Sequence, residues 1–92
     1  PGVATIVVKG ELDLVTMPYL AAQLSRALRV CPGRLVFDLS GTQFMDCGSA
    51  RLIADAGQRL PGGGRPVIRR PAPGVRRVLE LTGLDAHCEI EP

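Results

Sequence analysis

Four short stretches of the chain have the hydrophobic pattern of buried β-strands. They are expected at residues 3–9, 34–39, 65–70 and 87–91. The first is rich in β-branched side chains (Thr5, Ile6, Val7), which favour a strand over a helix. The last is expected from the alternation of Cys88 and Ile90.

Between these stretches apolar residues recur every three or four positions, which predicts amphipathic helices. The first helix is expected at residues 17–30, with an apolar face made of Met17, Leu20, Ala21, Leu24, Leu28 and Cys31. Thr16 is its candidate N-cap, and Pro18 is tolerated in its first turn. Pro32-Gly33 should end it.

Two further helices complete the pattern. The second should begin after Asp46, with an apolar stripe formed by Ala50, Ile53, Ala56, Gly57 and Leu60. The third should run from Pro73 to Gly83, where a left-handed glycine would close it. The resulting β-α-β-α-β-α-β order requires crossover connections. It predicts a single α/β domain over residues 1–92, a small parallel or mixed sheet with helices packed on it.

Composition narrows the classes of function. Of the 92 residues, 46% are hydrophobic and 22% are charged, which suits a folded domain. The apolar runs are too short for a membrane span. A net charge of +2 and an aromatic content of 3% argue against nucleic-acid binding. The start of the chain lacks a secretory pattern, so we expect a cytoplasmic protein without membrane or nucleic-acid partners.

The cysteines and the histidine give little sign of catalysis or metal binding. Cys31, Cys47 and Cys88 form no CxxC pair, and His87 is the only histidine. We therefore expect no metal site, no cofactor and reduced thiols. A catalytic cysteine needs a base directed toward it, and nothing in the sequence brings His87 to one. Enzyme activity is not expected, and Cys31 and Cys88 are interpreted as packing residues.

The most informative segment runs from Val36 to Ile53. Two acids, Asp38 and Asp46, leave apolar surroundings near the ends of a strand and a helix. An acid at position 46 can accept hydrogen bonds from free N–H groups of the following helix and offset its dipole. The small residues 47–49 should form the first turn of that helix.

Three motifs, in order and with matching spacing, resemble the STAS family, the fold of bacterial anti-sigma factor antagonists. VVKGELDLVT resembles a strand and Gly-Glu-Leu-Asp turn of that family, and LVFDLSGTQFMD its central strand and acidic loop. PGVRRVLELTGLD resembles its last helix and the following turn. Most of the chain takes part in the match. The family usually has one more strand before Val3, and the resemblance leads us to expect that this strand is absent or shortened in the sequence given.

The resemblance implies a STAS-like domain that antagonises an anti-sigma factor. In phosphorylated members the acidic loop leads into Asp-Ser-Ser-Gly-Leu or Asp-Ser-Thr-Gly-Leu. A serine-kinase-type anti-sigma factor phosphorylates the first hydroxyl residue. Dephosphorylated, the antagonist binds that kinase and releases a sigma factor. Here Cys47 falls on the phosphoacceptor position. The implied partner surface consists of Asp13, Thr16, Asp38, Asp46, Cys47, Gly48, Ser49, Ala50 and Arg51.

The cysteine at position 47 leaves several interpretations of the regulation open, because a thiol is not a substrate for an ordinary serine kinase. The protein is then a permanently active antagonist, or one switched at Ser49 or by oxidation of Cys47, or a protein that has lost this role and kept the fold as a binding module. The alternative class is a STAS-fold sensor, either a redox module using Cys47 or a module binding an anion or nucleotide at the helix N-terminus. A homodimer formed through an exposed sheet edge also stays open.

Overall fold

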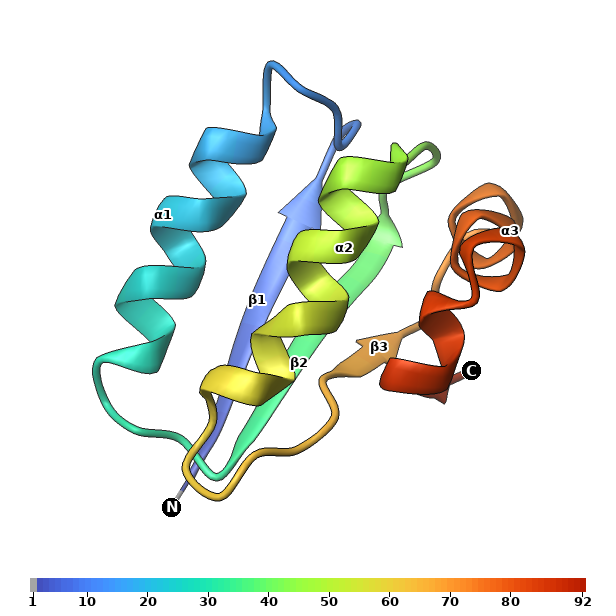
Figure 1. Cartoon of the computed structure of the whole chain (residues 1–92). Coiled ribbons are helices and arrows are strands. Elements are labelled where there is room, and N and C mark those ends of the chain that lie inside the picture. Colours follow the sequence, from blue (N-terminus) through green and yellow to red (C-terminus); the bar gives the residue numbers. More distant parts are fainter. Residues whose placement is uncertain (1) are drawn as a thin grey trace.

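A computed structural model describes residues 2–92 of the chain and shows the expected alternation of strands and helices (Figure 1). The strands are β1 (Val3–Lys9), β2 (Arg34–Gly41), β3 (Val67–Arg69) and β4 (Glu89–Glu91). The α-helices are α1 (Met17–Leu28), α2 (Cys47–Asp55) and α3 (Pro73–Thr82). Two short 3-10 helices, η1 (Ala56–Arg59) and η2 (Leu84–His87), follow α2 and α3. The predicted α/β order is confirmed.

The four strands form one sheet in the order β1-β2-β3-β4, and every neighbouring pair is parallel. Each crossover therefore moves to the next strand in the same direction. Because such crossovers are right-handed, α1, α2 and α3 should all lie on one face of the sheet. Figure 1 shows α2 in front of β1 and β2, α1 beside β1, and α3 beside β3. The sheet, which the sequence predicts to be parallel or mixed, is parallel.

Alternation along β2 separates the core face from the other face. Leu35, Phe37 and Leu39 are fully buried and belong to the core with residues of all three helices. Burial of a side chain such as Phe37 contributes about 1.5–3 kcal/mol relative to exposure. The intervening positions, among them Asp38, therefore point to the sheet face without α1 and α2.

The first helix is shorter than predicted. It ends at Leu28, and Cys31 is exposed with a positive φ of 49°. The expectation that Cys31 packs on the apolar face of this helix is therefore wrong. The cause is local: the ring of Pro32 disfavours helical backbone at the residue before it, so the chain turns away before Cys31 can reach that face.

Other boundaries shift by a few residues. The predicted continuation of α2 to Leu60 becomes η1, although Ala56 and Leu60 remain buried. β2 extends to Gly41, two residues beyond its predicted end, whereas β3 and β4 are shorter than expected. Gly83 closes α3 in the left-handed conformation, with a φ of 73°. The predicted helix stop is confirmed there.

Candidate functional site

Two loops meet where β1 and β2 end. In the β1–α1 loop, the N–H of Leu12 donates to the carbonyl of Phe44 at 3.0 Å. The carbonyl of Leu12 accepts from the N–H of Asp46 at 2.9 Å. This bridge follows from the parallel pairing of β1 and β2, whose carboxyl ends lie at the same edge of the sheet. It brings the region of Asp13 beside the start of α2.

The start of α2 has the geometry expected of an acid-capped helix. Asp46 is extended, and its carboxylate accepts a hydrogen bond of 2.7 Å from the N–H of Ser49. The predicted capping role of Asp46 is thus confirmed. Cys47 and Gly48 form the exposed part of the first turn. A Cβ atom on Gly48 would lie 3.7 Å from an Asp46 carboxylate oxygen and 3.9 Å from the Met17 sulfur, so α1 also begins close by.

The residues that follow Cys47 differ in their exposure to solvent. Ser49 and Ala50 are fully buried, whereas Arg51 is exposed. Ser49 and Ala50 lie under the turn, so in this conformation neither presents its side chain at the surface. The Ser49 hydroxyl is buried and has no hydrogen-bond partner among residues 2–92. A kinase could reach this hydroxyl only if α2 moved.

The β1–α1 loop is held by Asp13. One of its carboxylate oxygens accepts hydrogen bonds from the N–H groups of Val15 and Thr16, both at 3.0 Å. The Thr16 hydroxyl donates to the Glu11 carbonyl at 2.8 Å and accepts from the Asp13 N–H at 3.0 Å. Hydrogen bonds from the N–H and the side chain of Thr16 and from the N–H of Val15 lower the pKa of Asp13, and the Thr16 N–H has the largest effect.

Thr16 does not cap α1 with its side chain, contrary to expectation. Its hydroxyl is engaged by the preceding loop, and its backbone is already helical with φ −92° and ψ −17°. A side-chain cap requires the extended backbone that Asp46 adopts, so Thr16 cannot reach the free N–H groups of the first turn. Thr16 stabilises the loop rather than the helix.

Asp38 does not join this site. It points to the sheet face opposite the core, where Arg70 contacts its carboxylate at 3.1 Å. The Ser40 hydroxyl donates to the same carboxylate at 2.8 Å. Hydrogen bonds from the Ser40 hydroxyl and N–H lower the pKa of Asp38, with a smaller effect from Arg70. Asp38 thus has partners of its own, Ser40 on the same strand and Arg70 directly after β3.

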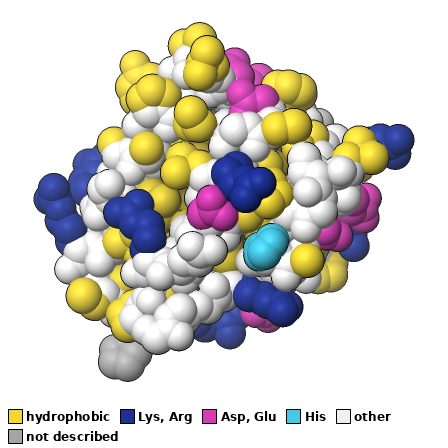
Figure 2. Space-filling model, in the orientation of Figure 1, with side chains coloured by type: hydrophobic (Ala, Val, Ile, Leu, Met, Phe, Trp, Pro, Cys, Tyr) yellow, Lys and Arg dark blue, Asp and Glu magenta, His cyan; other side chains and the backbone are white. Residues whose placement is uncertain are grey.

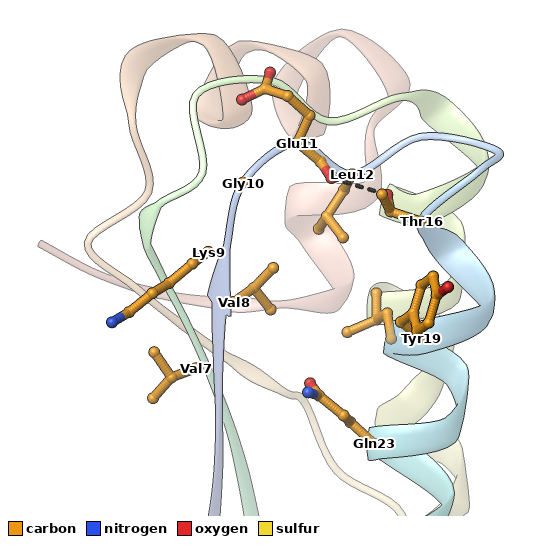
Figure 3. A pocket seen from close by; sticks show the side chains of 10 residues that line it. Val7, Val8, Lys9, Gly10, Glu11, Leu12, Thr16, Tyr19 and Gln23 are labelled. Carbon is orange, nitrogen blue, oxygen red and sulfur yellow. Dashed lines mark hydrogen bonds between the residues drawn. The ribbon is translucent and has the colours of Figure 1, made fainter.

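A groove of about 270 Å³ adjoins the β1–α1 loop (Figure 3). It lies between β1 and α1, and Gln23 points from the helix toward the strand. Its lining includes Val7, Leu12, Thr16 and Tyr19. β1 is the edge strand of the sheet and pairs only with β2 among residues 2–92. The groove therefore runs along an open strand edge.

The three cysteines differ in environment. Cys88 is buried, and burial raises the pKa of its thiol to about 11, with a further contribution from Asp85. Its predicted packing role is confirmed. Cys31 and Cys47 are exposed. Over residues 2–92, the structure contains no group of three or more His, Cys, Asp or Glu residues that could hold a metal ion. In the same range, no helix is long and apolar enough to span a membrane.

Sequence reasoning missed the apolar part of this surface. Leu14 and Val15 are 76% and 78% exposed at the tip of the β1–α1 loop, and Phe44 is 51% exposed in the adjoining loop. Their signal was present in the sequence, because Leu14 and Val15 fit neither the strand pattern before them nor the helix period after them. Large apolar residues in a loop are candidates for a contact surface.

A parallel sheet in chain order, helices on one face and an acid-capped helix start at its carboxyl edge define the class: a small α/β domain of the STAS type. The sequence profile of the STAS domain matches residues 1–92, and the chain belongs to this family.

Two curated relatives share most of this chain. The anti-sigma-F factor antagonist RsfB of Mycobacterium tuberculosis (strain ATCC 25618 / H37Rv) is 27% identical over 84 residues, which cover 91% of this chain and 69% of RsfB. An anti-sigma F factor antagonist of Lysinibacillus sphaericus is 29% identical over 84 residues, covering 87% of this chain and 72% of that protein.

Two solved structures share the fold. An anti-sigma factor antagonist from Mycobacterium paratuberculosis superposes with a TM-score of 0.89 and 31% identity, covering 99% of this chain and 78% of that one. The anti-sigma factor antagonist SpoIIAA in its unphosphorylated form has a TM-score of 0.79 and 24% identity. That match covers 99% of this chain and 81% of SpoIIAA. At that identity, the likeness to SpoIIAA concerns the fold alone.

Proposed function

We propose that this chain is an anti-sigma factor antagonist that binds a serine-kinase-type anti-sigma factor and releases a sigma factor. We further propose that the substitution at Cys47 has removed its phosphorylation switch. The names of its relatives and its fold support the first part. The proposal places the protein in the cytoplasm, where sigma factors act, and gives it a binding role without catalysis.

The observation that carries the proposal is the exposure of Cys47 at the first position of α2. A side chain there can meet a partner directly. It occupies the position that the family resemblance assigns to the phosphoacceptor, but it carries a thiol. Ser49 is the only hydroxyl residue between Phe44 and Asp55, and it is fully buried. The first turn of α2 therefore offers a kinase no accessible hydroxyl.

Charge explains why a phosphate at this position would oppose binding. The carboxylate of Asp46 precedes Cys47, and Asp13 lies across the Leu12–Met45 bridge. A phosphate group adds a charge of about −1.5 to −2 at neutral pH. Next to these acids, a phosphate would add further negative charge to the surface. In our proposal this surface binds the partner only when the side chain at position 47 is uncharged. The wild-type protein should therefore stay in its binding state.

The test uses purified serine-kinase-type anti-sigma factors of the source organism, each mixed with the full chain and ATP. We expect a wild-type complex that persists, with no added phosphate in the intact mass of the chain. Cys47→Ser should gain about 80 Da, one phosphate, and dissociate. Cys47→Asp should lose binding by about 100-fold or more while its circular dichroism and melting stay unchanged.

Cys31→Ser is the matched control, since it changes another exposed cysteine far along the chain. It should behave as the wild type in both assays. Phosphate on the wild-type chain would contradict the loss of the switch. Unchanged binding by Cys47→Asp would show that the contact surface lies elsewhere.

A further inference from the structure

The tip of the β1–α1 loop displays two large apolar side chains to solvent. Leu14 is 76% exposed and Val15 is 78% exposed, the two highest values among the exposed large hydrophobic residues described. Neither contributes to the core. Their exposure therefore needs an explanation other than folding.

The loop that carries them is held in place. Asp13 accepts hydrogen bonds from the N–H groups of Val15 and Thr16, and the N–H of Met17 donates to the Asp13 carbonyl at 2.8 Å. Thr16 adds the bond to the Glu11 carbonyl. The backbone beneath the two apolar side chains is thus ordered before any partner arrives. Such pre-organisation reduces the entropy that binding would otherwise cost.

The tip is continuous with the start of α2. Leu12 bonds to the backbone of both Phe44 and Asp46, so the two loops form one surface with the half-exposed Phe44 between them. Figure 2 shows hydrophobic and acidic side chains together at the top of the view, the end where Figure 1 places the β1–α1 loop. Segments 10–17 and 42–50 contain three acids (Glu11, Asp13, Asp46) and no Lys or Arg.

We propose that Leu14 and Val15 are the apolar anchor by which this chain binds its anti-sigma factor, inserting into an apolar pocket with a basic rim. The inference rests on the proposed function and adds the chemistry of the partner. Two exposed aliphatic side chains on an ordered loop match the pattern of a few residues that dominate binding energy. The acids around them would be complemented by basic residues on the partner. This charge complementarity would set the rate at which the two proteins meet and their relative orientation.

The test compares Leu14→Ser/Val15→Ser with the wild type in calorimetric titration against the purified anti-sigma factor. Burial of each side chain is worth about a tenfold change in affinity, so the double variant should bind about 100-fold more weakly. The ratio should be nearly the same at low and high salt, because apolar burial is not screened. Leu14→Met keeps the apolar area and should bind within about threefold of the wild type.

Leu81→Ser is the matched control, an equally drastic change at a 73% exposed residue on α3. It should leave affinity unchanged. If the wild type binds and the double variant binds within about threefold, the anchor is wrong while the proposed function stands. If the wild type binds no serine-kinase-type anti-sigma factor, both fall. If the double variant abolishes self-association of the chain but not anti-sigma binding, the surface serves a second copy and the inference is overturned.

Discussion

The starts of α1 and α2 lie side by side at the carboxyl edge of the sheet, yet they present opposite surfaces. Before α1 the chain makes a protruding loop with Leu14 and Val15 at its tip. At α2 the exposed first turn consists of the small residues Cys47 and Gly48. One start projects apolar side chains, and the other leaves room for a partner backbone to approach.

Each helix start is stabilised by its own aspartate, and the two aspartates act in different ways. Asp46 is extended and bonds to the Ser49 N–H inside the helix, so it stabilises α2 itself. Asp13 bonds to N–H groups that precede α1, so it stabilises the loop. The same residue type with similar spacing therefore produces a helix cap in one place and a loop support in the other. The backbone conformation at the following residues decides which of the two forms.

The largest expected effect tests how much the two starts depend on the Leu12 side chain. Leu12 is 2% exposed and lies between the loops. Leu12→Ala should lower the free energy of unfolding by about 2–5 kcal/mol, since it leaves a cavity beneath both loops. Urea unfolding measures this change. Leu81→Ala, at an exposed site, should stay within about 0.5 kcal/mol of the wild type. An equally small effect for Leu12→Ala would mean that the Leu12 side chain does not support the two loops.

A smaller change in stability is expected when the aspartate at either helix start is replaced, and it distinguishes the helix cap at Asp46 from the loop support at Asp13. Asp46→Ala removes the helix cap and should cost about 1 kcal/mol in the free energy of unfolding. Amide hydrogen exchange should speed up in the first turn of α2, at Ser49 and Ala50, and stay unchanged at Val15 and Thr16. The reverse pattern is expected for Asp13→Ala. If both variants accelerate exchange at both starts, the distinction drawn between the two aspartates is wrong.

Much of this organisation could be predicted from local sequence rules. The element order, the parallel sheet and the cap at Asp46 follow from periodicity, crossover length and the preference of acids before a helix. The direction of Asp38 was also accessible. With Phe37 and Leu39 in the core, a residue between them in a strand must point to the other face.

What the sequence did not predict depends on tertiary register. The burial of the polar Ser49 follows from how α2 packs on the sheet, which the helical period alone does not fix, whereas the burial of Ala50 agrees with the predicted apolar stripe. The type and position of Thr16 predict a helix cap, but hydrogen bonds within the loop engage its hydroxyl. The proximity of the two starts depends on the Leu12–Met45 bridge between residues more than thirty positions apart. A single sequence carries no local signal for such a pairing.

The smallest effect concerns the charge state of the loop support. The N–H bonds from Thr16 and Val15 hold the pKa of Asp13 below its ordinary value of 3.8. A depressed folded-state pKa means that the ionised carboxylate supports the loop above pH 3.8. This support is lost as the pH falls through the lower folded-state value. In an NMR titration, the amide signals of Val15 and Thr16 should therefore move with a midpoint below 3.8.

Two variants test whether the signal changes at Val15 and Thr16 come from the titration of Asp13. Asp13→Asn should flatten it at Val15 and Thr16, because the amide no longer ionises in this range. Asp38→Asn, which removes another carboxyl of lowered pKa on the opposite sheet face, should leave it intact. A midpoint at or above 3.8 would mean that the loop bonds do not favour the ionised form. The tip carrying Leu14 and Val15 would then lack the carboxylate support that distinguishes it from the start of α2.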